Sequence, residues 1–183
     1  RALVKVYRDS FNLYACAGLL FNHEGLRRGE EFVTRKITKG VARIKKSMEQ
    51  GVPFDPIQLG NIKAKRDWSD SEDFIRGVWL MLNEDKPEDY VLSSNETHEI
   101  SEFVTLAFEA AGITGRWAGE GLEAKFANFQ DIVLVEVNED FYRPAEGNLL
   151  YGNSDKAREE IGWKPEISFP NLVKRMVLHD LGS

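Results

Sequence analysis

The sequence predicts an α/β protein, in which short strands and longer helices alternate along the chain. Two observations support this prediction. Short apolar segments are followed by polar turns and then by stretches whose apolar residues recur with helical spacing. In residues 20–37, an apolar stretch leads through a loop with two glycines and two adjacent arginines into a helical pattern. Open α/β sheets bind ligands at such strand ends, and helix N-termini favour anions.

The composition is that of a globular chain. It has 183 residues, of which 42% are hydrophobic and 30% are charged. No apolar run approaches the roughly 20 residues that span a bilayer, and there is no signal-peptide pattern. Cys16 is the only cysteine, which excludes an internal disulfide and fits a reducing compartment. We therefore expect a cytoplasmic protein without a membrane partner.

The net charge of −6 is unevenly distributed. Between Arg27 and Lys46, eight basic residues stand against two acidic ones, a local charge of +6, so the rest of the chain carries −12. A basic zone on an acidic protein favours a compact anionic ligand over a long nucleic acid.

The first predicted element is a helix, because Leu3, Val4, Tyr7 and Phe11 are spaced along one helical face. Asn12 is a plausible helix end. No capping residue precedes this helix, so we expect that the chain opens inside it. Residues 13–21 are nearly all apolar, which predicts a strand buried on both faces.

The clearest helical pattern covers residues 30–50. Its apolar stripe consists of Val33, Ile37, Val41, Ile44 and Met48. The pattern places Arg35, Lys39 and Lys46 on the opposite, solvent-facing side. Lys36 falls at the edge of the stripe, where it can reach a cleft. Glu30 and Glu31 suit the positive end of the helix dipole.

The remaining elements are shorter and continue the alternation. Strands are expected at residues 57–59, 90–92, 116–119 and 131–137, with a loop at 120–130 and a turn at 141–146. Helices are expected after Trp68, at 100–111 before Gly112, at 155–161 and at 169–181. For the helix after Trp68, the pattern proposes Ser69 or Ser71 as the cap, and an inner face of Phe74, Val78, Trp79 and Leu82.

Several polar residues at element ends allow both a structural and a functional interpretation. Arg27 and Arg28 form either a phosphate site or a solvated pair. His23 is either a hydrogen-bonded structural residue or a ligand contact, and Asn22 either forms a turn or reads a ligand. The segment Lys65-Arg66-Asp67-Trp68 either binds an anion or forms a surface ion pair beside a packed tryptophan.

Arg143 and Glu146 have the same ambiguity, because they could simply pack or pair within a turn. His23, His98 and His179 lack metal-ligand spacing, so we expect no metal site. No Ser-His-Asp pattern, nucleophile elbow or P-loop is present. The residues therefore show several cations at the ends of α/β elements, with little general acid/base apparatus nearby.

Eight short motifs follow one another in a characteristic order. They are Phe21-Asn22-His23-Glu24, Arg27-Arg28-Gly29, Phe32-Val33-Thr34-Arg35-Lys36-Ile37, Leu59-Gly60-Asn61, Ala64-Lys65-Arg66-Asp67-Trp68, Trp79-Leu80-Met81-Leu82, Tyr142-Arg143-Pro144 and Trp163-Lys164-Pro165. This set resembles the GDP-mannose 4,6-dehydratase family of the extended short-chain dehydrogenase/reductases, over nearly the whole chain. The Asn-His-Glu, Arg-Arg-Gly and Lys-Arg-Asp-Trp motifs distinguish this family from many of its relatives.

The sequence also departs from the family pattern. Gly25-Leu26 replaces a usual Ser-Pro, which predicts a more mobile loop, and Ala145 replaces a usual Thr. Residues 120–130 match poorly. The family's glycine-rich fingerprint, its Thr and Glu catalytic pair and its Tyr-x-x-x-Lys motif are absent. The resemblance is therefore to the C-terminal half of such an enzyme.

The resemblance implies the C-terminal part of an extended NAD(P)-binding Rossmann fold plus a small α/β substrate-binding domain. Residues 1–25 and 66–95 would end the Rossmann domain, and 26–65 and 96–183 would form the substrate-binding part. The expected enzyme is a cytoplasmic lyase of nucleotide-sugar metabolism, in the route to GDP-fucose. It forms dimers or tetramers and converts GDP-mannose to GDP-4-keto-6-deoxymannose with NADP.

By matching position, the resemblance also implies site residues. Those expected to contact NADP are His23 and Arg28. Those expected to line the GDP-sugar pocket are Asn22, Val33, Lys36, Leu59, Gly60, Lys65, Arg66, Arg143 and Glu146.

Other functions stay open. The chain could be a non-catalytic nucleotide-sugar-binding or assembly fragment, or a related nucleotide-sugar epimerase or dehydratase. Nucleic-acid binding through Arg35, Lys39 and Lys46 is a further alternative, but the acidic remainder and the lack of an aromatic-basic stripe oppose it.

Overall fold

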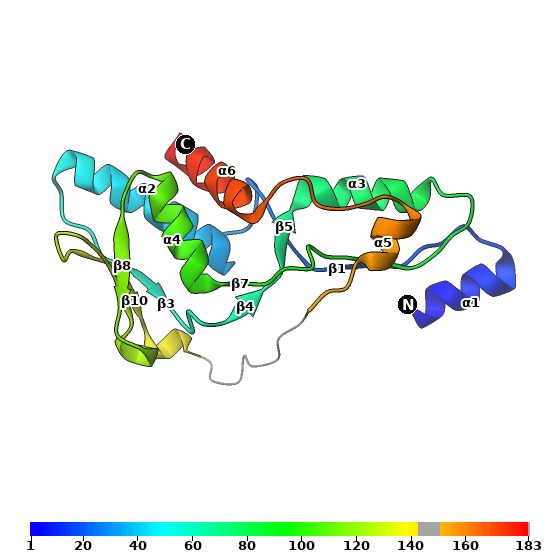
Figure 1. The fold of residues 1–183 in the computed structure, drawn as a ribbon, viewed down its shortest axis with the longest axis horizontal. Coiled ribbons are helices and arrows are strands. Elements are labelled where there is room, and N and C mark those ends of the chain that lie inside the picture. The colour runs from blue at the N-terminus through cyan, green and yellow to red at the C-terminus, as the bar shows by residue number, and fades with distance from the viewer. Residues whose placement is uncertain (143–150, 183) are drawn as a thin grey trace. The chain divides into compact units, whose positions relative to one another are not determined.

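A computed structural model describes residues 1–142 and 151–182, which form two compact units (Figure 1). The first unit contains Arg1–Glu24, Asp67–Thr97 and the segment that ends at Phe169. The second contains Gly25–Arg66, the segment that starts at His98 and the segment that starts at Pro170. The chain passes between the units several times, so each unit is assembled from distant parts of the sequence.

The first unit pairs its strands in parallel, as α/β connections require. Its strands are β1 (Gly18–Leu20) with β6 (Tyr90–Leu92), and β2 (Asn22–Glu24) with β5 (Trp68–Asp70). Its helices are α1 (Ala2–Phe11), α3 (Ser71–Leu82) and α5 (Asp155–Glu160). In register, Asn22 lies opposite Trp68 and His23 lies opposite Ser69.

The core of this unit is built around Trp163, which is fully buried and donates its Nε1–H to the carbonyl of Asp73 at 2.8 Å. Phe74, Met81 and Leu92 pack into the same cluster. A Cβ at Gly77 would lie 2.7 Å from the Trp163 Nε1, so only glycine lets α3 approach the indole this closely. The Trp163-Lys164-Pro165 motif is thus explained by packing.

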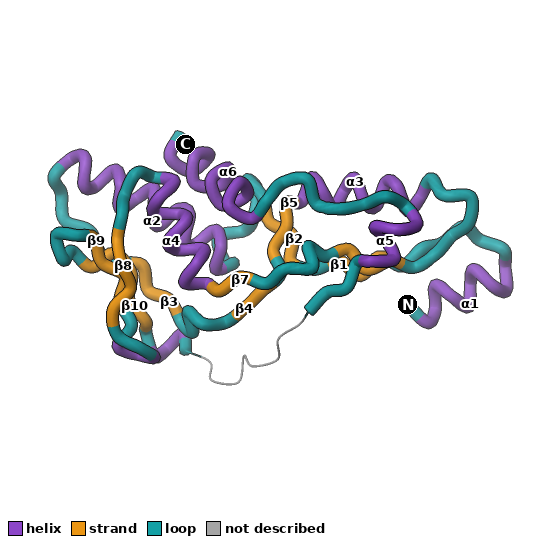
Figure 2. The backbone as a smooth tube through the Cα atoms, in the orientation of Figure 1, coloured by secondary structure: helices purple, strands orange, loops and turns teal. Residues whose placement is uncertain are grey.

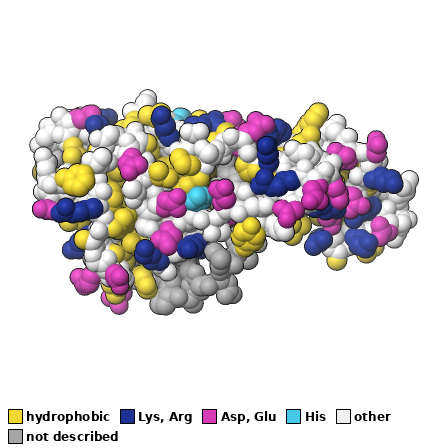
Figure 3. All heavy atoms as spheres, in the orientation of Figure 1, with side chains coloured by type: hydrophobic (Ala, Val, Ile, Leu, Met, Phe, Trp, Pro, Cys, Tyr) yellow, Lys and Arg dark blue, Asp and Glu magenta, His cyan; other side chains and the backbone are white. Residues whose placement is uncertain are grey.

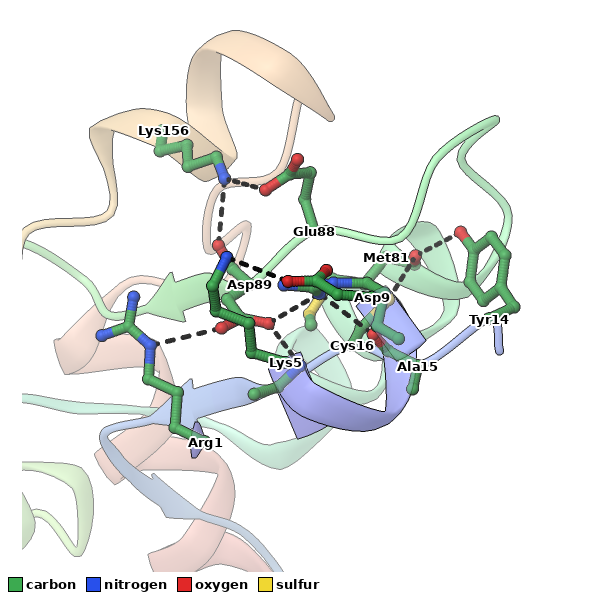
Figure 4. A network of polar contacts seen from close by, with 12 residues as sticks. Arg1, Lys5, Asp9, Tyr14, Ala15, Cys16, Met81, Glu88, Asp89 and Lys156 are labelled. Atoms are coloured by element: carbon green, nitrogen blue, oxygen red, sulfur yellow. Dashed lines mark hydrogen bonds and ion pairs between the residues drawn. The ribbon is translucent and has the colours of Figure 1, made fainter. Parts of the chain in front are cut away.

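Helix α1 is held to this unit by polar contacts, since none of its residues is buried. Figure 4 shows these hydrogen bonds and ion pairs, which form a network around Asp89. The Asp89 carboxylate accepts hydrogen bonds from Arg1, Arg8 and the Ala17 amide at 3.0–3.2 Å. Burial alone would raise the pKa of Asp89, but these hydrogen bonds and the charge of Arg8 outweigh burial and lower it. On the face shown in Figure 3, basic and acidic side chains intermingle over α1 and α5.

The second unit is a mixed four-stranded sheet with helices packed on it (Figure 2). The strand order is β3 (Ile57–Leu59), β10 (Val133–Val137), β9 (Lys125–Asn128), β8 (Gly115–Ala118), with only the β3–β10 pair parallel. The other elements are α2 (Val33–Gln50), α4 (Ile100–Ala110), α6 (Phe169–Leu181), the antiparallel pair β4 (Lys65–Arg66) and β7 (His98–Glu99), and the 3-10 turns η1 (Gly121–Glu123) and η2 (Glu139–Phe141).

Helices α2 and α4 bury the apolar stripes that their sequences predict. Ile37, Val41 and Ile44 of α2 are at most 1% exposed. On the α4 side, the ring of Phe108 stacks on Phe126 of β9 with centroids 5.3 Å apart. At 25 cal/mol per Å² of apolar area, each such side chain contributes roughly 1.5–3 kcal/mol when buried.

Several predicted elements are confirmed, and the α/β class is among them. The strands at 57–59 and 90–92 and the helix at 169–181 coincide with β3, β6 and α6. The first helix ends at Asn12, whose φ of 50° is left-handed as a helix terminus requires. None of the helices in the described part of the chain is long and apolar enough to cross a membrane.

The strand expected at 13–21 is wrong in length and in burial. Only Gly18–Leu20 is a strand, and all three residues are exposed, because within the described residues β1 pairs only with β6. Cys16 is half-buried. The polar segment Asn22–Glu24, expected as a turn, is a second strand, because β5 lies beside it.

The helix expected at residues 30–50 begins three residues later, at Val33. A turn closed by the Phe32 amide on the Gly29 carbonyl precedes it, so Glu30 and Glu31 lie outside the helix. Glu30 instead pairs with Lys39. Arg35 does not face solvent as expected: it is 8% exposed, because Asp180 of α6 lies against it.

Helix α3 differs from expectation in its cap and in its inner face. The Asp70 side chain, rather than a serine, accepts the Glu72 amide at 3.0 Å. Phe74 and Met81 are buried, whereas Trp79 is 62% and Leu82 56% exposed. The physical reason is that β6 and Trp163 pack on the side of α3 that carries Phe74, Gly77 and Met81, which leaves Trp79 and Leu82 on the opposite side.

Two further regions show what the sequence pattern left out. The expected loop at 120–130 contains β9, which is held by pairing with β8 on one side and with β10 on the other.

The described residues between Tyr151 and Phe169 pack in the first unit, although the expected division placed 96–183 in the substrate-binding part. The assignment of a Rossmann part and a substrate-binding part stays a prediction.

Candidate functional site

A cavity of about 490 Å³ lies in the second unit beside α2. Four basic side chains of α2 line it, namely Arg35, Lys36, Lys39 and Arg43. Ile57 and Phe141 contribute apolar surface, and Glu30 is the acidic residue of the lining. A cavity with clustered cations and an apolar wall suits a ligand that combines a phosphate with an aromatic group.

Lys36 is distinguished from the other cations by its surroundings. Its Nζ lies 4.0 Å from the centroid of the Phe141 ring, a cation–π contact. Within the described residues, no carboxylate pairs with it, whereas Lys39 pairs with Glu30 and Arg43 donates to the Asp55 carbonyl. Burial lowers the pKa of the Lys36 ammonium. Lys36 therefore presents a half-buried charge to the cavity, as its position at the stripe edge predicts.

Phe141 reaches Lys36 because Gly60 allows a close approach of two backbone segments. The Asn138 amide donates to the Leu59 carbonyl at 2.8 Å, which holds η2 against the end of β3. A Cβ at Gly60 would lie 2.1 Å from the Phe141 carbonyl oxygen. Gly60 is thus needed for packing, and Leu59 is 2% exposed, with its carbonyl bonded to the Asn138 amide.

Arg28 lies in the loop before α2. The Arg28 amide donates to the Gly25 carbonyl at 3.1 Å, which closes a turn. The Arg28 guanidinium stacks on Phe32, with its Cζ 3.4 Å from the ring centroid, and the side chain is half-buried. Val33, half-buried, follows as the first residue of α2. Stacking presets the direction of the guanidinium, which lowers the entropy cost of binding an anion.

Lys65 and Arg66 form β4, which pairs with β7. Lys65 is exposed and its Nζ lies 4.0 Å from Glu99, which Lys63 also contacts at 3.2 Å. Burial would raise the pKa of Glu99, but hydrogen bonds from Ser101 and Lys63 and the nearby lysine charges lower it. Arg66 is half-buried and donates to the Lys65 carbonyl at 2.8 Å.

Asn22 and His23 belong to the first unit, where both are exposed on β2. The His23 Nδ1 lies 3.0 Å from the Phe21 carbonyl, and the ring lies 5.3 Å from that of Phe74. A proton on Nδ1 would satisfy that carbonyl and leave Nε2 for another partner.

The described residues bring part of the expected site together. Lys36 and Gly60 meet at Phe141, while Arg28, Val33, Lys65 and Arg66 lie elsewhere in the same unit. Arg143 and Glu146 lie outside the described residues. Sequence analysis missed Phe141 and Arg43 as lining residues. Phe141 directly precedes the Tyr142-Arg143-Pro144 motif, which was the available signal, whereas Arg43 carried none beyond its charge.

Comparison with known proteins identifies the family. The model of the GDP-mannose 4,6 dehydratase family matches residues 1–176. The chain belongs to this family. Related proteins named GDP-mannose 4,6 dehydratase occur in Drosophila melanogaster, at 44% identity over 96% of this chain, and in Dictyostelium discoideum, at 43% identity over 98%. The chain spans about half the length of these relatives, 43% and 49% respectively.

Solved structures confirm the fold class. RMD from Pseudomonas aeruginosa, in complex with NADPH, matches 99% of this chain and 53% of its own, with a TM-score of 0.78 and 21% identity. The dTDP-glucose 4,6-dehydratase of Bacillus anthracis, in complex with NAD, matches 97% of this chain and 48% of its own, with a TM-score of 0.69 and 16% identity. The GDP-mannose 4,6-dehydratase family member described here thus shares its fold with about half of each of these α/β enzymes.

Proposed function

We propose that this chain is the nucleotide-sugar-binding half of an NADP-dependent GDP-mannose 4,6-dehydratase, a lyase that acts as a homo-oligomer in the cytoplasm. Family membership supports the activity. The observation that carries the proposal is Lys36, a half-buried cation in a cavity with an apolar wall, without a carboxylate partner among the described residues. Such a charge is stabilised when a phosphate binds.

Each expected substrate residue has a chemical role in this proposal. Lys36, Arg66 and Arg143 supply cations for the diphosphate, and Glu146 accepts hydrogen bonds from ribose hydroxyls. The backbone at Leu59 and Gly60, the Asn22 amide and Val33 would line the base and sugar. Contacts at the nucleotide end supply binding energy that orients the distant sugar.

The cofactor residues fit a nicotinamide dinucleotide phosphate. Arg28 presents a stacked guanidinium beside a turn, which suits a phosphate, and His23 presents a ring nitrogen at a strand end. Lys65, which belongs to the expected GDP-sugar pocket and not to the cofactor site, would add a positive charge near Arg66. His23 and Arg28 would hold NADP, which would supply the hydride acceptor and donor for an internal redox elimination of water from the sugar. The Tyr, Lys, Thr and Glu of that chemistry are absent from this sequence, and we assign no catalytic residue here.

Titration with GDP tests the nucleotide site. Lys36→Met keeps the apolar stem but removes the charge, so we expect GDP affinity to fall by about 10- to 150-fold, the equivalent of roughly 1.5–3 kcal/mol. The matched control is Lys46→Met, an exposed lysine on the same helix. Isothermal titration calorimetry would measure both, beside a melt of each variant without ligand. Unchanged GDP affinity in a folded Lys36→Met protein would refute the site.

A second candidate is a binding or assembly fragment without catalysis. The observation that favours it is the same cavity with Lys36 beside it, because a phosphate site by itself predicts binding and not chemistry. Both candidates predict GDP binding, but only the first predicts turnover of GDP-mannose in the full-length protein. A related epimerase would instead form an epimeric nucleotide sugar without loss of water, which analysis of the product would reveal.

A further inference from the structure

Arg35 is buried in the first turn of α2, although the helical pattern predicts a solvent-facing side chain. It is 8% exposed, and its position is explained by two partners from different segments. Its Nη1 donates to the carbonyl of Leu26 in the preceding loop at 2.5 Å. Its Nη2 lies 2.9 Å from the Oδ1 of Asp180, near the end of α6. A guanidinium can do this because its donors diverge in a rigid fork.

Asp180 is the anchor of this arrangement. Its side chain is 1% exposed, so a carboxylate here requires close partners. Besides Arg35, the Thr38 hydroxyl donates to its Oδ2 at 2.7 Å. Thr38 therefore links α2 to α6 without Arg35. The distinct contribution of Arg35 is its second bond, which extends the link from Asp180 to the loop.

The Leu26 carbonyl, which accepts the hydrogen bond from Arg35, belongs to the turn that carries Arg28. This turn is closed by the Arg28 amide on the Gly25 carbonyl, and Leu26 is its second residue. Gly25 gives this turn backbone freedom, because glycine has no Cβ to restrict φ. A part-buried hydrogen bond from Arg35 to the Leu26 carbonyl removes some of that freedom.

We propose that Arg35, held by Asp180, is a positioning residue that fixes the 25–28 turn and so presents Arg28 in its binding direction. The inference rests on the proposed function, in which Arg28 contacts NADP. Arg35 would touch no ligand through this role. It would act by keeping the turn in one conformation before the cofactor binds. Binding then carries no additional entropy cost for ordering the turn, and cofactor affinity is higher.

Two substitutions separate this role from simple attachment of α6. Arg35→Met and Thr38→Val each remove one bond to Asp180, but only Arg35→Met releases the Leu26 carbonyl. Both should lower the melting temperature. Amide hydrogen exchange then reports on the turn, and we expect exchange at Arg28 to accelerate about tenfold or more in Arg35→Met and to change little in Thr38→Val. Equal exchange at Arg28 in both variants would overturn the proposal.

Cofactor titration of the full-length protein provides the functional readout. We expect Arg35→Met to raise the Kd for NADP about five- to tenfold and Thr38→Val to change it less than about twofold, because only Arg35→Met lowers the fraction of molecules that hold the turn in its competent form. If Arg35→Met does not fold, Arg35→Lys serves instead, since one ammonium keeps the charge beside Asp180 but cannot also hold the Leu26 carbonyl.

The Arg28→Ala variant distinguishes a wrong cofactor assignment from a wrong positioning role. If it leaves NADP affinity unchanged, the cofactor assignment is wrong and the positioning role falls with it. If it weakens NADP but the Arg35 variants do not, only the positioning role is wrong.

Discussion

Lys36 shows how a single residue acquires a chemical role from its surroundings. Four basic residues of α2 line the same cavity, yet Lys39 is neutralised by Glu30 and Arg43 is bonded to the Asp55 carbonyl. Lys36 is half-buried above Phe141, where the ring faces its charge and water is partly excluded. Loss of water weakens the charged state and at the same time strengthens attraction to a bound phosphate.

The lowered pKa of Lys36 predicts a pH dependence of nucleotide binding. The ammonium loses its proton at a lower pH than the ordinary lysine value of about 10.4, so phosphate affinity falls as pH rises through the lowered pKa. We expect GDP affinity to decline as the pH rises toward the ordinary lysine value in the unmodified protein, and to decline less in Lys36→Met. Calorimetric titrations across this range provide the measurement. Parallel declines in the two proteins would place the titrating group elsewhere.

At the scale of the element, α3 shows how a helix start is chosen among similar candidates. Ser69, Asp70 and Ser71 are all good capping residues, and the helix begins after Asp70 because this side chain accepts the Glu72 amide. Further along, the Asp73 carboxylate accepts the amides of Glu166 and Ile167. One helix thus uses two carboxylates, one for its own terminus and one for the segment after Trp163.

Removal of the α3 cap should destabilise the protein measurably. We expect Asp70→Ala to cost at least about 1 kcal/mol, because the Glu72 amide loses its acceptor, which corresponds to about 2–4 °C in Tm. Asp70→Asn should recover part of the loss, since an amide oxygen also accepts. Ser71→Ala is the control and should change Tm little. A larger loss in Ser71→Ala than in Asp70→Ala would show that the cap is assigned to the wrong residue.

At the scale of the whole molecule, the chain holds many expected ligand contacts but no expected catalytic group. The residues expected to bind substrate in the second unit lie around α2, β3 and β4, and His23 and Asn22 lie on β2 of the first unit. The family's hydride-transfer residues are not in the sequence. We therefore propose that ligand binding and hydride transfer depend on different residues of the whole enzyme.

This separation predicts that the 183-residue chain alone has no dehydratase activity. The chain lacks the Tyr-x-x-x-Lys motif and the Thr and Glu pair, which are the groups that the family uses to move the required protons. The chain would be incubated with NADP and GDP-mannose and assayed for the keto sugar, with a full-length GDP-mannose 4,6-dehydratase as the positive control. Formation of the keto sugar above the buffer background would contradict the prediction.

Sequence reasoning was most reliable where the signal is local. The stripe of Ile37, Val41 and Ile44 predicted the buried face of α2, and the stripe edge predicted that Lys36 reaches a cleft. It was wrong for Arg35, since the pattern could not include Asp180, which lies on a different helix near the other end of the chain. The β9 strand was missed because its pairing with β8 and β10 is not visible in its own residues.

The sequence by itself determined the α/β class, most helix positions and the family, because helical periodicity, turn residues and short motifs are all local properties. Only the tertiary structure decided which charges are neutralised and which face a cavity. That depends on partners brought together from distant segments, as Phe141 is brought to Lys36 by the close approach at Gly60. A lysine or arginine is written the same way in the sequence whether its charge is paired, buried or exposed. Its affinity for an anion depends on those surroundings, which only the tertiary structure shows.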